Sequence, residues 1–443
     1  YNEQDVYLVE ELDQKKQFIR LIITVILMTK SRYQENSGKV KLWDNLIYNL
    51  LKEEGIVIPP APSIRTREKI IGAYVKAPVP GKYRYPASLD LTALYPTICM
   101  MLNMSPETLV REEQGRIDWV NRQLAGEDLS ADCREQGFAM AANGAAFRLD
   151  KVGVLPKGMR YVFETRKKFK NLMLAEKSKK EKWLAAGGTD KAELKVFDDK
   201  IAMLDATQNA MKVLANSGYG VTANNAFRYF SRSIAEGITL TGQLSIQYIS
   251  DAINAKLNEQ FGTDRDYVIT CDTDSAYLTL DRVPTDPKNI LQSVDEIDTF
   301  INEILQPHIN ESYQALSDRL GAQKNMLDMK REAIADVGIF RGKKNYVLRV
   351  WDNEGVRFAE PELKMTGIET ARSDKISETD VLGFIRKKLE ADLEILLTGT
   401  QEQLLTSIDE FKSVFYNAPI DVIASPKGVS DITSWLDGKG GLR

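Results

Sequence analysis

Three aspartates in two distant segments have the type and spacing that a site for divalent cations needs. Asp90 lies in an apolar, strand-like segment, and Asp272 and Asp274 lie in the run Cys-Asp-Thr-Asp-Ser. In an extended chain the side chains of residues i and i+2 point to the same side, so these last two carboxylates can face one ion. Carboxylates held at the ends of two strands can build a site for two Mg²⁺ ions, as phosphoryl transfer requires. Either segment alone is a weak signal, because an acidic turn between strands is usually only solvated.

The residues after Asp90 favour a turn from a strand into a helix. The chain continues Leu-Thr-Ala-Leu-Tyr-Pro, and a helix is expected to begin near Tyr95. Backbone N–H groups at such a start form an anion site, so the amides of Ala93 and Leu94 can bind a triphosphate. The ring of Tyr95 would then pack beneath a bound sugar. The alternative is that Tyr95 is an ordinary core aromatic.

A basic helical hairpin can supply cations for the same phosphates. Two long helices are expected at about residues 158–186 and 191–215, separated by a Gly-Gly pair. Residues 166–182 hold eight Lys or Arg and two Glu, and Arg166 and Lys170 share one helical face. A solvated basic helix is the simpler alternative. On the second helix a comparable face contains Lys212, Asn216 and Tyr219, and Gly220 follows it.

The elements that must position these residues follow from hydrophobic periodicity and from turn residues. The acidic run is expected at the tip of a β-hairpin formed by residues 267–270 and 276–280. A second strand pair is expected at residues 345–351 and 356–360. Residues 110–150 give no clear signal, and the fold class is predicted to be α+β. Helices are predicted over most of residues 1–60, 225–262 and 377–416, and strands within residues 72–98.

Composition limits the class of protein. The 443 residues are 43% hydrophobic and 28% charged, with a net charge of −4, which is typical of a globular protein. Three cysteines without metal-ligand spacing favour a reducing compartment, and we expect the cytoplasm. His308 is the sole histidine, which excludes His-based triads and most zinc sites. No apolar run is long enough to span a bilayer, so no membrane partner is expected.

Four segments, in this order along the chain, resemble the signature motifs of family B DNA polymerases. Residues 90–98 resemble motif A, residues 212–220 resemble motif B, and residues 271–275 resemble motif C. Residues 343–346, Lys-Lys-Asn-Tyr, resemble the Lys-Lys-Arg-Tyr motif that contacts primer-template DNA. Cys271 stands where motif C usually has Gly, a small change that the turn can absorb. Further segments resemble the subgroup from T-even-type bacteriophages: residues 72–76, 105–108, 331–335, 350–355 and 363–365.

The resemblance implies a metal site and a reaction. Asp90 and Asp274 would bind two Mg²⁺ ions, or Mn²⁺, with the carbonyl oxygen of Leu91 as a further ligand. Asp272 would support them, and Glu332 matches, more weakly, a third carboxylate near the metals. The implied reaction is template-directed addition of dNMP to a primer 3′-hydroxyl in phage DNA replication.

The resemblance also implies how the substrates are bound. Arg166, Lys170 and Lys212 would hold the triphosphate of the dNTP together with the amides of Ala93 and Leu94. The ring of Tyr95 would exclude a 2′-hydroxyl. The pocket of the nascent base pair would be shaped by Asn216, Tyr219 and Gly220, and the primer-template backbone would be followed by Lys343, Lys344 and Tyr346.

The family pattern divides the chain into six parts. Tyr1 and Asp5 match the third motif of a 3′–5′ exonuclease, but its first two motifs would lie upstream, so we expect no proofreading by this chain alone. The clamp-binding tail is also expected to be absent from this chain, so the sliding clamp is expected as a partner only of the full-length family member. The expected parts are residues 1–17 (exonuclease remnant), 18–60 (part of an N-terminal domain), 61–152 and 225–372 (palm), 153–224 (fingers) and 373–443 (partial thumb).

Three alternatives remain beside the polymerase. A reverse transcriptase is disfavoured by the helical motif B and by the absence of an Asp-Asp pair in motif C. A non-catalytic DNA-binding derivative is disfavoured because all three aspartates are retained. The third alternative is one half of a split polymerase, in which a second polypeptide supplies the exonuclease or thumb portions. The abrupt ends of the chain fit this third alternative as well as they fit a fragment.

Overall fold

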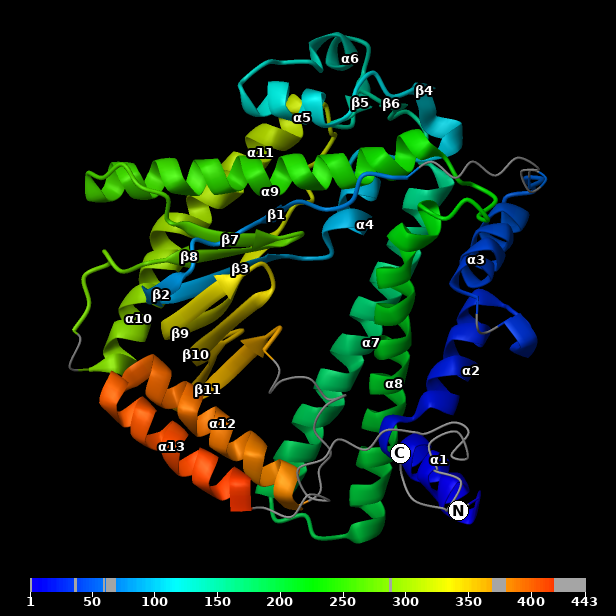
Figure 1. The fold of residues 1–443 in the computed structure, drawn as a ribbon. Helices are drawn as coiled ribbons and strands as arrows, with labels where there is room; N and C mark the ends of the chain where they lie inside the picture. Colours follow the sequence, from blue (N-terminus) through cyan, green and yellow to red (C-terminus); the bar gives the residue numbers. More distant parts are fainter. Residues whose placement is uncertain are drawn as a thin grey trace, which may run out of the picture. The chain divides into compact units, whose positions relative to one another are not determined.

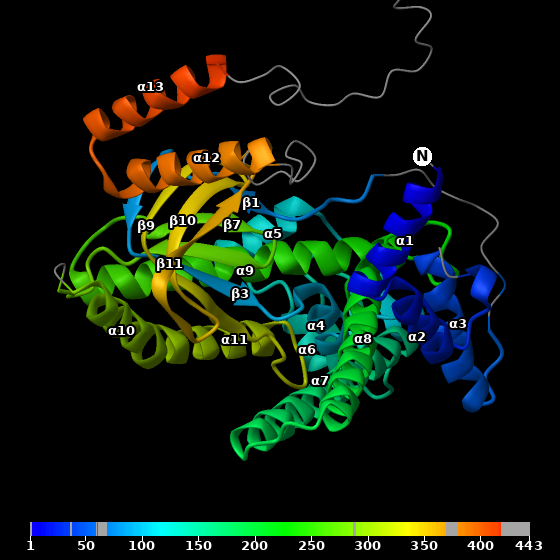
Figure 2. The same ribbon diagram turned by 90° about the horizontal axis from the view of Figure 1, so that it is seen from below.

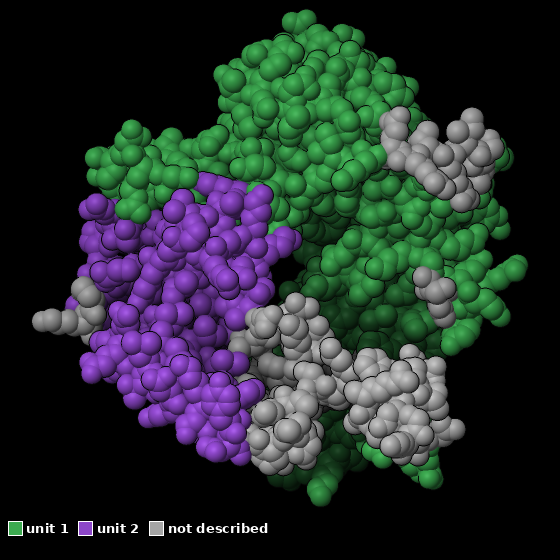
Figure 3. Space-filling model, in the orientation of Figure 1, with its two compact units in different colours: residues 1–75, 89–276, 302–330 green, residues 76–88, 277–301, 331–443 purple. Residues whose placement is uncertain are grey.

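The structure is a computed structural model, and its described residues form two compact units. Figure 3 shows these units in different colours. The first unit contains residues 1–75, 89–276 and 302–330, and the second contains residues 76–88, 277–301 and 331–443. Both units combine helices with strands, which confirms the predicted α+β class. The described residues are 2–35, 38–58, 60, 69–286, 289–368 and 380–417.

The first unit is mainly helical (Figure 1), and the predicted aspartates lie at the ends of its strands. Its strands have the order β1-β7-β8-β3, and a separate three-stranded sheet has the order β4-β6-β5. The helices are α1 (Asn2–Lys16), α2 (Phe18–Thr29), α3 (Lys39–Glu53), α4 (Leu94–Met101), α5 (Ile117–Leu124), α6 (Ala131–Glu135), α7 (Val154–Ala185), α8 (Lys191–Thr222), α9 (Arg232–Phe261) and α11 (Gln306–Arg319). The strands are β1 (Val75–Lys76), β4 (Leu109–Arg111), β5 (Phe138–Met140), β6 (Ala146–Arg148), β7 (Val268–Asp272) and the adjoining ends of β3 (Pro86–Leu91) and β8 (Ser275–Thr279).

The predicted helical hairpin is confirmed and is longer than expected. Helices α7 and α8 lie side by side in both ribbon views (Figures 1 and 2). Their turn ends with Asp190, whose carboxylate caps α8 by accepting hydrogen bonds from the N–H groups of Ala192 (2.7 Å) and Glu193 (3.4 Å). Two ion pairs, Lys200 with Glu176 at 2.9 Å and Lys180 with Asp198 at 2.6 Å, join the two helices in the half of the hairpin nearer its turn.

Helix α9 is the buried centre of the first unit. Every residue from 233 to 246 is buried, including several with polar side chains. A helix was expected over residues 225–262, but α9 begins only at Arg232. The reason is an N-cap, because the hydroxyl of Ser231 accepts a hydrogen bond from the N–H group of Ile234 (3.4 Å).

The second unit is built on an antiparallel meander of three strands. Its order is β9-β10-β11, and β2 pairs with β9. The predicted turn between β10 and β11 is confirmed, since Glu354 and Gly355 have φ angles of 52° and 86°, as a two-residue hairpin turn requires. The long strand β9 was not predicted. The elements of this unit are β2 (Gly81–Arg84), α10 (Ile290–Phe300), β9 (Met329–Gly342), β10 (Asn345–Asn353), β11 (Val356–Thr366), α12 (Asp380–Thr398) and α13 (Gln401–Asn417).

The helical segment expected at residues 377–416 is two helices within its described part. Gly399 follows α12, and a reciprocal cap starts α13. The Thr400 N–H group donates to Gln403 Oε1 (2.8 Å), and the Gln403 N–H group donates to Thr400 Oγ1 (3.3 Å). None of the helices in the described part of the chain combines the length and apolarity that a bilayer crossing needs.

Candidate active site

The structure brings Asp90 next to the acidic turn. The N–H group of Leu91 donates a hydrogen bond to the carbonyl oxygen of Asp274 (2.9 Å), because β3 and β8 are neighbouring strands. Asp90, Asp272 and Asp274 are all partly buried. Three carboxylates from segments far apart in the sequence therefore lie at adjoining strand ends, as the residue pattern predicts.

The acidic turn has an unusual backbone. Thr273, between the two aspartates, has a φ of 63°, which non-glycine residues rarely adopt. Its N–H group donates to the carbonyl oxygen of Tyr74 (3.0 Å), and the N–H group of Asp274 donates to the carbonyl oxygen of Asp272 (2.7 Å). The preceding Cys271 is completely buried, with its Sγ 3.3 Å from the Ser250 hydroxyl of α9. These contacts hold the backbone of the acidic turn on both sides of Thr273.

The donor set at these strand ends suits magnesium. Carboxylate and carbonyl oxygens are the ligands that Mg²⁺ prefers, and this ion usually keeps several waters or substrate phosphates. Among the described residues no three His, Cys, Asp or Glu side chains form a ready cage for a metal ion. A site completed by water and phosphate needs no such cage. Asp90, Asp274 and the Leu91 carbonyl therefore fit the ion in their chemistry.

The ring of Tyr95 in motif A contacts a tyrosine ring of motif B. The Tyr95 ring lies 4.4 Å from that of Tyr219, measured between centroids, with the planes tilted by 42°. Burial raises the pKa of the Tyr95 phenol above its ordinary value, and Tyr219 adds to the shift. The carboxylates of Asp274 and Asp272 act in the same direction. A β-carbon on Gly242 of α9 would lie 2.9 Å from the Tyr95 ring, so this glycine is needed for the close approach.

Sequence reasoning missed Gly242, although an isolated glycine inside a helical pattern is a signal of such packing. Motif B contains two further glycines with different surroundings. A β-carbon on Gly218 would lie 2.9 Å from the Trp43 ring of α3, whereas one on Gly220 would meet nothing within 4 Å. Trp43 also donates a hydrogen bond from Nε1 to the Ser217 hydroxyl (3.0 Å). Gly218 is thus explained by packing, and Gly220 borders open space.

The start of α4 has the geometry expected after motif A. Ala93 is the N-cap, with a φ of 49°, and the helix begins at Leu94. The N–H groups of a helix's first turn have no partners within the helix. The two amides predicted to bind a triphosphate therefore lie at a genuine helix start.

The predicted cations lie on α7 and α8. Lys170, Lys212 and Asn216 are exposed, whereas Arg166 is partly buried. The Nε of Arg166 is a buried nitrogen that has no hydrogen-bond partner within the described residues. Lys212 precedes Tyr219 by seven residues, which is two turns along one face of α8.

The remaining candidates lie in the second unit. Lys343 and Lys344 are exposed in the turn between β9 and β10, and Tyr346 follows on β10. The Tyr346 hydroxyl lies 2.7 Å from that of Tyr277. Glu332 is engaged within this unit. Its Oε2 accepts a hydrogen bond from Ser88 (3.0 Å), and its Oε1 accepts one from Lys364 (2.8 Å).

Only one of the two exonuclease candidates falls within the described residues. Asp5 is an exposed residue of α1, and Tyr1 lies outside the described residues. The expectation of no proofreading stays a prediction.

Known proteins similar to this chain point to one family. The model of DNA polymerase family B matches residues 29–425. The DNA-directed DNA polymerase of Escherichia phage RB69 is 32% identical over 84% of this chain and 46% of its own length. That of Enterobacteria phage T4 is 29% identical over 99% of this chain and 52% of its own length. A DNA polymerase of Pyrococcus glycovorans is 28% identical over 80% of this chain and 37% of its own length.

The two phage relatives confirm the predicted resemblance to the T-even-type subgroup. The chain spans about half the length of these two relatives. The family model covers most of the chain, motifs A and C meet at the strand ends described above, and Tyr219 of motif B contacts Tyr95 of motif A. The chain therefore belongs to DNA polymerase family B.

Proposed function

We propose that this chain catalyses template-directed addition of dNMP to a primer 3′-hydroxyl in phage DNA replication. The observation that carries the proposal is the hydrogen bond from the Leu91 N–H group to the Asp274 carbonyl oxygen. It brings the strand end with Asp90 beside the acidic turn, in a chain of the polymerase family. The contact between Tyr95 and Tyr219 supports the same site from motif B.

Asp90 and Asp274 hold two divalent cations in this proposal, together with the carbonyl oxygen of Leu91. Asp272 supports the site from the other end of the turn. The bound cations would lower the pKa of the primer hydroxyl and neutralise charge on the triphosphate. The 3′-hydroxyl would give up its proton to water and its oxygen would attack the α-phosphorus, while the bond from that phosphorus to the bridging oxygen breaks to release pyrophosphate. Glu332 is the weaker candidate in this proposal, and its carboxylate accepts hydrogen bonds from Ser88 and Lys364.

The incoming nucleotide is bound between α4 and the helical hairpin in this proposal. Arg166, Lys170 and Lys212 neutralise its phosphates, and the amides of Ala93 and Leu94 donate hydrogen bonds to them. The unpartnered Nε of Arg166 supports this role, because an unsatisfied buried donor is costly. The ring of Tyr95, supported by Gly242, leaves no room for a 2′-hydroxyl. The pocket for the new base pair is bordered by Asn216, Tyr219 and Gly220.

The proposal assigns the classical parts of a polymerase to these elements. Helices α7 and α8 are the fingers, the strands with their packed helices are the palm, and α12 with α13 belongs to the thumb. Lys343, Lys344 and Tyr346 follow the primer-template backbone.

Primer extension tests this function directly. The purified chain is given Mg²⁺, four dNTPs and a primed template, beside the variant Asp274→Asn. Extension by the wild type that the variant lacks is the expected result. A wild-type chain that is folded, binds the primed template and yet adds no nucleotide would overturn the proposal for this chain by itself. Adding a polypeptide with the further portions of a relative then tests the split-polymerase alternative.

A further inference from the structure

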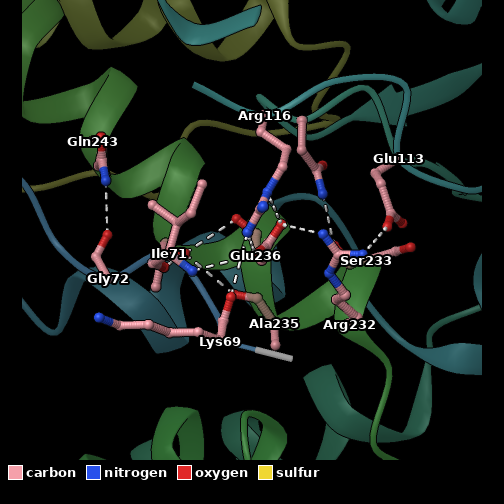
Figure 4. A network of polar contacts seen from close by, with 12 residues as sticks. Lys69, Ile71, Gly72, Glu113, Arg116, Arg232, Ser233, Ala235, Glu236 and Gln243 are labelled. Carbon is pink, nitrogen blue, oxygen red and sulfur yellow. Dashed lines mark hydrogen bonds and ion pairs between the residues drawn. The ribbon is translucent and has the colours of Figure 1, made fainter. Parts of the chain in front are cut away.

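A buried polar face of α9 holds the extended segment that leads to β1. We call residues 69–74 the strap. Figure 4 shows Lys69, Ile71 and Gly72 of the strap within a network of polar contacts that includes Arg116, Glu236 and Gln243. Three side chains of α9 hold its backbone: Glu236 accepts a hydrogen bond from the Ile71 N–H group (3.2 Å), Thr239 donates one to the Ile71 carbonyl (2.7 Å), and Gln243 donates one to the Gly72 carbonyl (2.7 Å).

Glu236 can hold the strap from a buried position because arginine side chains compensate the negative charge of its carboxylate. The residue is completely buried, and Arg116, the N-cap residue of α5, donates to both of its oxygens, from Nε at 3.1 Å and from Nη2. Arg232 lies 3.7 Å from the carboxylate. Nη2 of Arg116 also donates to the carbonyl oxygen of Lys69 in the strap (3.4 Å). Because the two arginines hold this buried carboxylate in one orientation, its oxygen is in position to accept the hydrogen bond from the Ile71 N–H group.

The strap continues into contact with the acidic turn. The carbonyl oxygen of Tyr74 accepts the hydrogen bond from the Thr273 N–H group (3.0 Å). Thr273 has a left-handed backbone, with a φ of 63°, that persists only where the surroundings hold it. This threonine separates Asp272 from Asp274. A continuous series of contacts therefore runs from the polar face of α9 to the peptide between the two carboxylates.

We propose that Glu236, Thr239 and Gln243 are positioning residues for the acidic turn. They hold the strap, and the strap holds Thr273 in the conformation that presents Asp272 and Asp274 to divalent cations. Groups that orient metal ligands affect metal binding although they do not touch the metal. The role of the metals rests on the proposed function, whereas the mechanical link from α9 to Thr273 does not.

Two near-isosteric substitutions release the strap without removing a buried charge. Thr239→Val and Gln243→Met each delete one donor to a strap carbonyl, singly and together. Thr241→Val is the matched control. Thr241 is also buried on α9, but its hydroxyl oxygen accepts a hydrogen bond from the N–H group of Ala142 (3.0 Å), which lies outside the strap. All variants are made in the full chain, and circular dichroism checks their folding.

Three measurements separate positioning from simple loss of stability. Hydrogen exchange of the peptide that spans the acidic turn should be about fivefold faster in the double variant, as weakening of the single hydrogen bond from Thr273 to Tyr74 implies. Mn²⁺ affinity, measured by electron paramagnetic resonance, should fall about tenfold. In primer extension, kcat should fall while KM for the primed template stays unchanged. The single variants should show smaller shifts in the same direction, and Thr241→Val should show none of them.

An acidic turn that exchanges equally in wild type, the single variants and the double variant would overturn the proposal. Equal shifts in Thr241→Val would also overturn it, because they would show a general loss of stability. If the wild type binds Mn²⁺ and the strap variants weaken that binding, but no chain extends a primer, the proposed function fails and the positioning role stands. If the wild type extends primers and the variants match the control, only the positioning role fails.

Discussion

Two turns between strands use the same backbone device for different purposes. Thr273 in the acidic turn and Lys344 in the turn between β9 and β10 both have a left-handed backbone, with φ angles of 63° and 54°. The acidic turn is partly buried and is held by the strap, whereas the side chains of Lys343 and Lys344 are exposed. A metal ligand must be placed to within a few tenths of an ångström, while a lysine acts on a phosphate as a mobile point charge. Under the proposed function, in which one turn binds metal and the other a phosphate, burial follows the precision that each turn needs.

The largest expected effect comes from removing a carboxylate of the acidic turn. Asp274→Asn keeps the shape of the side chain but removes its charge, so primer extension should fall at least about 1,000-fold. Steady-state rates with Mg²⁺ measure this loss. Asp264→Asn is the control, because Asp264 is an exposed acid in the loop after α9, and it should retain wild-type activity. Normal activity in Asp274→Asn would remove the metal role from the turn.

A second test addresses the left-handed backbone itself. Thr273→Pro cannot adopt a positive φ and has no N–H group for the Tyr74 carbonyl, so activity should fall about 100-fold. Thr273→Gly adopts this conformation without strain and keeps the N–H group, so it should stay within a few-fold of wild type. Equal loss in both variants would show that the threonine side chain, not the backbone, is what the turn requires.

A third test concerns the aromatic contact between motifs A and B. Tyr95→Ala removes the ring that contacts Tyr219, so incorporation of ribonucleotides relative to deoxynucleotides should rise about 10- to 100-fold. Tyr95→Phe keeps the ring and should keep the discrimination. The ratio of kcat/KM for the two sugars is the measurement. Unchanged discrimination in the alanine variant would mean that another group excludes the 2′-hydroxyl.

The smallest effect is expected at the exposed turn. Lys344→Ala should weaken primer-template binding by about threefold and reduce the slope of log Kd against log salt by about one. The matched control is Lys82→Ala, which removes an exposed lysine of β2 in the same unit. A 100-fold loss of primer-extension activity in Lys344→Ala, as large as the loss expected for Thr273→Pro, would contradict the contrast between the two turns.

Local signals in the sequence predicted the hairpin of α7 and α8, the acidic β-hairpin and the turn before β11. Each of these rests on neighbours in the chain, such as the Asp190 cap or the pair of Glu354 and Gly355. Strand β9 and the small sheet of β4, β6 and β5 were missed, and part of their pairing joins segments far apart in the sequence, as where β2 pairs with β9. Arg111 of β4, for example, pairs with Ala146 of β6. Short strands of this kind have little periodicity of their own.

The sequence by itself determined which chemistry is available: three carboxylates, a basic hairpin and the order of four motifs. Only the tertiary structure decided how these parts meet. It placed Asp90 beside the acidic turn through neighbouring strands, brought Tyr95 into contact with Tyr219 and close to Gly242, and buried Glu236 against the strap. The physical reason is that side-chain type and helical spacing are local properties, whereas backbone pairing between distant strands and the compensation of a buried charge require the complete packing.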